Sequence, residues 1–286
     1  MSRILEERLK GYNAETAEGE FDALREILQE VILSGLSDTD FFNLAVFQGG
    51  TCLRLVHGLR RFSEDLDFII LAAQPQFDWS AYEKKITTRC NLYGFEPEFL
   101  NKENQTSPVK KMLVRQGSLS DIVSFTHTQD PRRKIMTRLD IDVNPPSGLS
   151  SETSFLDFPL PYRLQIPTIN CLFAGKCHAL LCRQYTKGRD LFDFQWFVSK
   201  HVEPDLEYLE NTLVQSGPWE DSDINVTPYW LKFALIERIS SLDWNAAKDD
   251  ILRFLPEREV ETVLLWSRDF FLSRIEKLFM YSSNGR

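Results

Sequence analysis

The sequence contains no long hydrophobic run and no apolar stretch near its start. No segment approaches the roughly 18 consecutive apolar residues of a membrane-spanning helix. The first twenty residues, MSRILEERLKGYNAETAEGE, carry charges throughout and lack the apolar core of a secretory signal. We therefore expect a protein that has no contact with a membrane, is not exported and works in the cytoplasm.

Cysteine is scarce and shows no paired pattern. The 286 residues contain five Cys, an odd number, and no CxxC pair. Cys171, Cys177 and Cys182 cluster, but their spacing fits no zinc motif. Reduced thiols that pack as small apolar side chains are expected, in agreement with a cytoplasmic location.

Positively charged residues are in the minority: the sequence has 33 Lys and Arg and 42 Asp and Glu, which gives a net charge of −9. This balance argues against a general nucleic-acid coat, because phosphate binding needs concentrated positive charge. It leaves open a local basic groove, with solvated strand ends as the alternative interpretation. The basic residues that would line such a groove are Lys84, Lys85, Arg89, Lys110, Lys111, Arg115, Arg132, Arg133, Lys134 and Arg138.

The remaining composition is that of a globular protein, with 43% hydrophobic and 26% charged residues and no repeat. Apolar spacing predicts a helix over residues 21–36 that stops at Gly35, and another over residues 38–47. A short helix follows at 51–57 and a longer one at 79–93. Alternation and β-branched residues predict strands at 66–71, 95–100, 110–115, 121–128 and 134–143.

The chain changes character after a strong breaker, Asn144-Pro145-Pro146-Ser147-Gly148. Helical spacing dominates residues 169–184, 190–200 and 204–281. We therefore predict an α+β protein with a mixed α/β domain over residues 1–168 and a mainly helical domain over residues 169–286.

The segment FQGGTCLRLVHGLRRFSEDLDFII, residues 47–70, predicts a nucleotide site. Gly49 and Gly50 allow close backbone approach, and Thr51 at a helix start offers a hydroxyl and free N–H groups to phosphate. Asp65 and Asp67 lie two apart in a strand and so share one face, where their like charges favour a Mg²⁺ or Mn²⁺ ion. Arg54, one turn from the glycines, is a further candidate phosphate ligand.

A third carboxylate is expected on a neighbouring strand. In the run Arg138-Leu139-Asp140-Ile141-Asp142 both acids share one face, so the residues leave the choice between Asp140 and Asp142 open. Such a carboxylate would hold metal or take the proton of a hydroxyl nucleophile. Solvent exposure at a strand end is the alternative.

A second dense cluster, GKCHALLCRQYTKGRDLFDF, covers residues 175–194. Its cations suit phosphate, a Lys as a point charge and an Arg as a fork. Asp190 and Asp193 share a helical face and can anchor those cations. An ordinary salt-bridged helix pair would give the same pattern. The candidate phosphate ligands here are Lys176, Arg183 and Lys187.

These motifs closely resemble the AbiEii/AbiGii-type nucleotidyltransferase toxins of the polymerase-β-like nucleotidyltransferase superfamily, over residues 44–197. The likeness rests on GGTxLR followed by RFSxDLDF and on a late K…R…KxRDxxD motif. It implies a polymerase-β-like mixed-sheet domain whose site receives a Lys/Asp motif from the helical domain. It also implies metal at Asp65, Asp67 and, in preference to Asp142, Asp140. Lys176 and either Asp190 or Asp193 are implied to be needed for activity.

The resemblance further implies a toxin of a toxin–antitoxin or abortive-infection system. Its reaction would be Mg²⁺- or Mn²⁺-dependent transfer of nucleotides from an NTP to RNA, such as the tRNA 3′ end, and a cognate antitoxin would be a partner. Transfer to a protein hydroxyl or to a small molecule such as an antibiotic is the first alternative. A catalytically degenerate protein that binds a partner is the second.

Overall fold

The structure, a computed structural model, describes residues 3–101, 107–117, 123–128, 130 and 133–282. The chain folds into two compact units. Unit 1 comprises the described parts of Met1–Gly58, Phe62–Pro145 and Ser151–Ile166. Unit 2 comprises those of Leu59–Arg61, Pro146–Ser150 and Pro167–Arg286, so the two units alternate along the sequence. The predicted domains, residues 1–168 and 169–286, stay a prediction.

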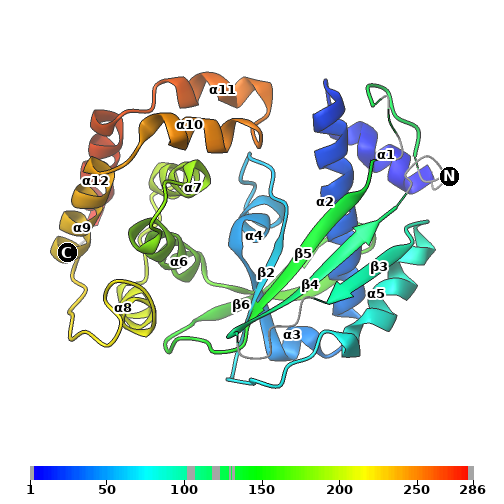
Figure 1. The fold of residues 1–286 in the computed structure, drawn as a ribbon, viewed down its shortest axis with the longest axis horizontal. Coiled ribbons are helices and arrows are strands. Elements are labelled where there is room, and N and C mark those ends of the chain that lie inside the picture. Colours follow the sequence, from blue (N-terminus) through cyan, green and yellow to red (C-terminus); the bar gives the residue numbers. More distant parts are fainter. Residues whose placement is uncertain (1–2, 102–106, 118–122, 129, 131–132, 283–286) are drawn as a thin grey trace. The chain divides into compact units, whose positions relative to one another are not determined.

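Unit 1 is built on a mixed sheet with the strand order β1-β2-β5-β4-β3 (Figure 1). Strands β2 and β5 run parallel, while the other neighbouring pairs are antiparallel. The α+β class with a mixed sheet is therefore confirmed. The strands are β1 (Ala45–Gln48), β2 (Leu66–Ile70), β3 (Pro97–Asn101), β4 (Val109–Gln116) and β5 (Ile135–Asp142).

Alternation along β5 gives the sheet a buried face and an open face. Ile135, Thr137, Leu139 and Ile141 are buried, whereas the residues between them are exposed or half-buried. Successive side chains of a strand point to opposite faces, so Arg138, Asp140 and Asp142 share the open face.

Helices α2 (Ala17–Ser37) and α5 (Ser80–Leu92) contact each other beside the sheet (Figure 1). Helix α2 continues past Gly35, so the predicted stop there is wrong. A Cβ atom at Gly35 would lie 3.1 Å from the Cα of Ile86 on α5, so the missing side chain serves close helix packing. Tertiary packing has outweighed the low helix propensity of glycine. Unit 1 also contains α1 (Arg3–Gly11), α3 (Phe41–Leu44) and α4 (Gly49–Leu55).

The single helix predicted over residues 38–47 is also wrong, because it is a four-residue helix, α3, followed by strand β1. Ala45, Val46 and Phe47 are all buried, and the strand pairs with β2 through Ala45↔Ile70. A short, continuous apolar run of this kind has no period that separates a buried strand from a helix.

Two further strand predictions need correction. Residues 121 and 122 of the predicted strand 121–128 lie outside the described residues, and 123–128 form no strand. Instead, the N–H groups of Thr126, His127 and Thr128 donate to the carboxylate of Glu20, at 2.6, 2.9 and 2.8 Å. The sequence reading also missed a two-stranded sheet, β6 (Ser151–Leu156) with β7 (Tyr162–Pro167).

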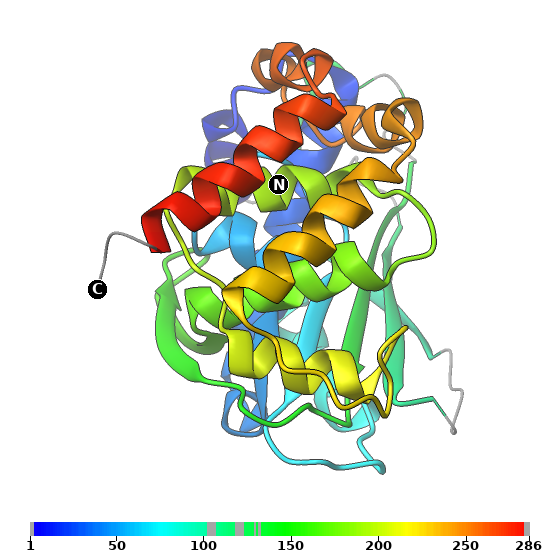
Figure 2. The same cartoon turned by 90° about the vertical axis from the view of Figure 1, so that its left-hand side faces the viewer.

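Unit 2 is helical, as predicted for most of this region. Figure 2 shows α9 and α12 side by side, and these two helices contact each other. A Cβ atom at Gly188 would lie 1.8 Å from the carbonyl oxygen of Ala247, so only glycine permits α7 to pack against α10 here. The helices are α6 (Ile169–Cys182), α7 (Gly188–Ser199), α8 (Leu206–Gln215), α9 (Pro228–Ser240), α10 (Trp244–Leu252), α11 (Glu257–Leu264) and α12 (Arg268–Ser282).

All five cysteines are free thiols, as the odd count indicated. Burial raises the pKa of the Cys177 thiol and that of Cys90, which suits packing rather than reactivity. Among the helices of the described residues, none combines the length and the apolar character needed to cross a bilayer.

Candidate functional site

The glycine turn lies directly against the first acidic strand. Gly49 has φ +81°, and a Cβ atom on it would lie 2.2 Å from Oδ2 of Asp67. A side chain at position 49 would therefore meet both backbone strain and a clash with the carboxylate. The start of α4 and the Asp67 carboxylate are thus held side by side within unit 1.

Thr51 attaches α4 to the start of β2. Its buried hydroxyl donates to the backbone carbonyl of Asp65. Gly50 is buried as well. The hydroxyl of Thr51 therefore fixes the strand, and the predicted contact of Gly49, Gly50 and Thr51 with phosphate rests on the backbone of the turn.

Parallel pairing brings the predicted carboxylates together on unit 1. Asp67 and Asp140 are register partners on β2 and β5, whereas Asp142 lies opposite Ile69. Arg138 joins the two ends of the set. Its Nη2 atom lies 2.5 Å from Oδ2 of Asp65, and its Nε lies 3.0 Å from Oδ2 of Asp140.

Burial and charge act in opposite directions on these groups. Burial raises the pKa of Asp140 above its usual value, and the nearby charges of Arg138 and Lys111 offset this in part. Burial works to lower the pKa of Arg138, but the charges of Asp65, Asp140 and Asp67 outweigh it and the pKa is raised. The Oδ1 atom of Asp140 is buried and accepts no hydrogen bond.

Asp142 has a different environment from Asp140. Its Oδ1 atom accepts a hydrogen bond of 2.9 Å from the N–H of Asn144. Burial raises the pKa of Asp142, and this hydrogen bond opposes the rise. Asp142 is thus engaged with the turn that follows β5, whereas Asp140 faces the other acids. The geometry favours Asp140 as the third carboxylate.

The donor chemistry of Asp65, Asp67 and Asp140 suits a hard divalent cation, which prefers oxygen ligands. The unsatisfied Oδ1 of Asp140 is a buried oxygen that a cation would satisfy. Within the described residues, however, no three Asp, Glu, His or Cys side chains converge as a ready-made metal site. Asp65 and Asp140 are instead bridged by the guanidinium of Arg138. The three carboxylates therefore have the right chemistry for a divalent ion, but two of them are paired with an arginine.

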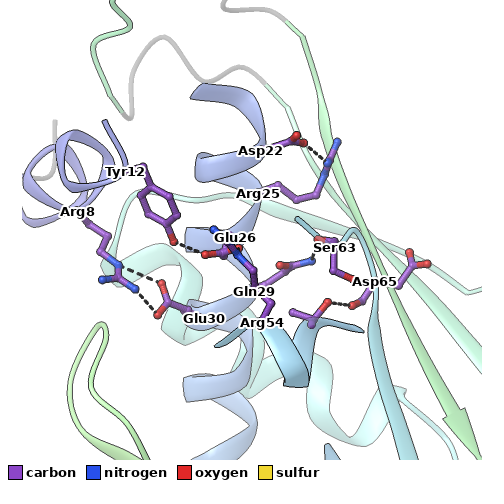
Figure 3. A network of polar contacts seen from close by, with 11 residues as sticks. Arg8, Tyr12, Asp22, Arg25, Glu26, Gln29, Glu30, Arg54, Ser63 and Asp65 are labelled. Carbon is purple, nitrogen blue, oxygen red and sulfur yellow. Dashed lines mark hydrogen bonds and ion pairs between the residues drawn. The ribbon is translucent and has the colours of Figure 1, made fainter. Parts of the chain in front are cut away.

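Arg54 belongs to a polar network between α1, α2 and α4 (Figure 3). Its Nε atom lies 2.6 Å from Oε2 of Glu26, and its guanidinium lies over the ring of Phe62 at 4.3 Å from the centroid. Tyr12 donates a hydrogen bond of 2.8 Å to the same Glu26. Arg54 is therefore engaged within the fold, and its predicted contact with phosphate stays a prediction.

The same network contains a buried acid with an unusual titration. Arg8 donates to both carboxylate oxygens of Glu30, at 2.7 and 3.2 Å. Burial raises the pKa of Glu30 to about 7, although the charge of Arg8 opposes the rise. The sequence reading missed Glu26 and Glu30, because polar residues on the buried side of α2 break the apolar stripe that it relied on.

In unit 2, Asp193 is the centre of a buried ion cluster. Its carboxylate lies 2.6 and 2.7 Å from Nε and Nη2 of Arg61 and 2.8 Å from Nζ of Lys176. The Asp193 side chain is 0% exposed. Burial works to raise the pKa of Asp193, but the two cations outweigh it and the pKa is lowered. Asp193 therefore positions Lys176, and its oxygens are turned toward protein groups.

Asp190 makes a different kind of contact: its Oδ2 lies 2.8 Å from Nε of Arg183 as an ion pair, but this buried oxygen accepts no hydrogen bond. Lys187 differs from these paired residues. Its ammonium makes no ion pair within the part of the chain that the structure describes. Burial lowers the pKa of Lys187 to about 8, and the charges of Arg183 and Arg189 add to the effect.

Several predicted basic-groove residues are paired with acids. The ion pairs are Arg89–Asp38, Arg115–Glu98 and Arg133–Glu18. Lys111 is exposed and lies opposite Asp140 in the register of β4 and β5. Arg132 lies outside the described residues. The exposed positive charge next to the carboxylates therefore comes mainly from Lys111 and Arg138.

Comparison with protein families gives a match to most of the chain. The family model described as "Nucleotidyl transferase AbiEii toxin, Type IV TA system" matches residues 31–273. The search of the curated proteins found no match.

Among solved structures, the crystal structure of JHP933 from Helicobacter pylori is similar with a TM-score of 0.53 and 20% identity. The match covers 93% of this chain and 96% of that chain. MenT4, a nucleotidyltransferase toxin from Mycobacterium tuberculosis, is similar with a TM-score of 0.49 and 20% identity, over 96% of this chain and 98% of that one. At this identity the likeness to JHP933 supports the fold alone.

Proposed function

Since the chain belongs to the AbiEii family of nucleotidyl transferase toxins, we propose that it transfers nucleotides from an NTP to an RNA acceptor such as the tRNA 3′ end. The reaction would depend on Mg²⁺ or Mn²⁺. The description of the family as a type IV toxin–antitoxin system supports a cognate antitoxin as its partner.

One observation carries this proposal: the register of the parallel strands β2 and β5. It sets Asp67 opposite Asp140, and the Asp67 carboxylate lies against the backbone of Gly49. The carboxylates that would hold a metal ion and the glycine turn that would bind phosphate adjoin each other on unit 1. Such a pairing is what a metal-bound triphosphate would need.

The proposed chemistry is an in-line displacement at the α-phosphate of the NTP. A hydroxyl of the acceptor forms the new P–O bond, the bond to the β-phosphate breaks, and pyrophosphate leaves. The proton of the hydroxyl passes to water, and Asp140 would complete the ligand set of the divalent ion through its buried Oδ1, which accepts no hydrogen bond. A bound divalent ion would offset the negative charge of the phosphates, with Asp65, Asp67 and Asp140 as its ligands.

The family resemblance implies that Lys176 and Lys187, which belong to unit 2, bind the triphosphate, and we include them in the proposal on that ground. The Lys176 side chain is 15% exposed and is fixed by Asp193 at 2.8 Å. Lys187 has no ion-pair partner among the described residues, and a half-buried ammonium without a counter-ion is suited to an anionic ligand. Asp193 would act by positioning Lys176, and Asp190 by positioning Arg183.

An RNA acceptor is favoured over a small molecule by the open sheet face of unit 1. Lys111 and Arg138 place positive charge on either side of Asp140, and Met136 on the same face is exposed. Asp65, Asp67 and Asp140 outnumber these two cations, so a bound divalent ion would be needed before this face of a chain with a net charge of −9 attracted a phosphate backbone.

The test is to incubate the purified protein with Mg²⁺, each labelled NTP and either total tRNA or a cell lysate. The Asp65→Asn/Asp67→Asn double variant serves as the control, with its fold checked by circular dichroism. Label on tRNA that the control fails to add would support the proposal.

Label on a protein or a small molecule in place of RNA would contradict the proposed acceptor and leave the chemistry standing. Label added equally by the control would rule out Asp65 and Asp67 as the metal ligands. No transfer from any NTP to any acceptor would contradict the whole proposal.

A further inference from the structure

We propose that Arg138 is an internal competitor of the divalent ion, holding two of its carboxylate ligands until the ion displaces it. This inference rests on the proposed function, because it concerns the metal site assigned there. It goes further by giving a role at the metal site to Arg138, which the sequence marks only as a basic residue of the sheet.

The contacts of Arg138 lie on the oxygens that an ion would need. Its Nη2 and Nε atoms lie 2.5 Å and 3.0 Å from Oδ2 of Asp65 and Oδ2 of Asp140. A carboxylate oxygen that accepts a charged hydrogen bond has its negative charge offset already. A divalent ion at the same oxygens would also be repelled by the guanidinium at close range. The two cations therefore exclude each other.

The side chain of Arg138 is suited to leaving. It is 46% exposed and lies on the open face of β5, so moving it away empties no part of the core. The acids that it contacts are less exposed: the exposed fraction of the side chain is 29% for Asp65 and 16% for Asp140. The carboxylates thus stay in place while their counter-charge is exchanged.

The arrangement of the acids agrees with this competition. Among the described side chains no three acids converge as a metal site, and Asp65 and Asp140 both turn an oxygen toward the guanidinium. The buried Oδ1 of Asp140 remains without a hydrogen bond, since Arg138 satisfies only the other oxygen. A divalent ion has the coordination capacity to satisfy it, whereas the single contact of Nε does not.

The experiment measures Mn²⁺ binding to the full chain, without NTP, from the loss of the electron paramagnetic resonance signal of free Mn²⁺. The variants are Arg138→Gln, which removes the charge, and Arg138→Lys, which keeps it. Arg115→Gln is the matched control, because Arg115 lies on neighbouring β4 and pairs with Glu98 instead.

Arg138→Gln is expected to bind Mn²⁺ roughly ten-fold or more tightly than the natural chain, through loss of one adjacent positive charge. Arg115→Gln should stay within about two-fold, because its charge is more distant and exposed to salt. Arg138→Lys should bind a few-fold more tightly, since a lysine gives up the forked contact to two carboxylates. If Arg138→Gln does not fold, the Mn²⁺ affinity of Arg138→Lys is compared with that of the natural chain instead.

Equal or weaker Mn²⁺ binding by a folded Arg138→Gln would overturn this inference and leave the proposed function intact. Equal tightening in Arg115→Gln would also overturn it, because the effect would then be one of general charge. No binding by any of these proteins would contradict the proposed metal site and the inference together.

Discussion

Unit 1 and unit 2 each gather aspartates and cations, but Asp140 of unit 1 and Asp193 of unit 2 have opposite environments. In unit 1, Asp140 has a buried oxygen without a hydrogen bond and shares one half-exposed arginine with Asp65. In unit 2, Asp193 is completely buried and accepts three contacts from Arg61 and Lys176. Unsatisfied acids suit ligand binding, whereas saturated acids suit the positioning of neighbours. Identical residue types thus acquire different roles through burial and partners.

The largest effect on stability should come from Asp193→Ala. Its loss would leave Arg61, which is 3% exposed, as a buried charge without its main partner. Removing one member of a buried ion pair costs about 3–5 kcal/mol of unfolding free energy. Urea unfolding followed by circular dichroism measures it, with exposed Asp223→Ala as the control. A loss below about 1 kcal/mol would show that the cluster is not structural and would remove the contrast between the units.

The complementary change in unit 1 is Asp140→Asn, which should reduce activity and spare the fold. We expect nucleotide transfer to fall about 10³-fold, equivalent to roughly 4 kcal/mol of transition-state stabilisation. Unfolding free energy should change by less than about 1 kcal/mol, because the amide keeps the size of the carboxylate. Asp142→Asn is the matched control on the same strand face and should lose only a few-fold. If Asp142→Asn loses more nucleotide-transfer activity than Asp140→Asn, Asp142 is the third carboxylate.

Glu30 extends the comparison to a buried acid with a single cation. Its folded pKa is raised from 4.5 to about 7, so the folded state keeps a proton that the unfolded chain has released. The resulting stabilisation is complete below pH 4.5 and is lost as pH rises through about 7. Replacing Glu30 with Gln should remove roughly 1–3 kcal/mol of this pH dependence.

Urea titrations of unfolding between pH 5 and pH 8 would measure the Glu30→Gln effect. Glu7→Gln is the control, since Glu7 is exposed and pairs with Arg3 on the surface of α1. Parallel pH profiles for the natural chain and Glu30→Gln would contradict the prediction.

The smallest expected effect concerns Lys187, a half-buried cation of unit 2 that makes no ion pair among the described residues. Burial lowers its pKa to about 8, so its charge is lost as pH rises through that value. If Lys187 binds the triphosphate, KM for NTP should rise about ten-fold by pH 9 relative to pH 7. Lys187→Arg should remain flat over this range, because an arginine stays charged. An identical rise in both proteins would assign the effect to another group.

The sequence predicted helices and strands best where the apolar residues of the element all lie on one face. The alternation of Ile135, Thr137 and Leu139 located β5 to within a residue or two. Gly35 was misjudged because its reason lies in contact with α5 rather than in local propensity. Strand β1 was missed because its apolar run has no diagnostic period.

The site was predictable in its residue types but not in its pairings. Spacing marked Asp65 and Asp67 and left Asp140 and Asp142 open, since acids two apart share a strand face, and the family resemblance preferred Asp140. The bridging role of Arg138 depends on the register of β2 against β5, which no local pattern encodes. The Arg61–Asp193 pair joins residues 132 apart in the sequence, so only the fold could identify it.

The alternation of the two units along the chain has a practical consequence for fragments and chimeras. Leu59–Arg61 belongs to unit 2, although Gly58 and Phe62 on either side belong to unit 1. A protein truncated after residue 168 would therefore keep Arg61 and lose Asp193, its bidentate partner. A hybrid that takes residues 169–286 from a relative would combine Arg61 of this chain with the relative's counterparts of Asp193 and Lys176, which did not evolve together. A chimera that exchanges unit 2 must therefore also exchange residues 59–61, which are separated from the helices in the sequence.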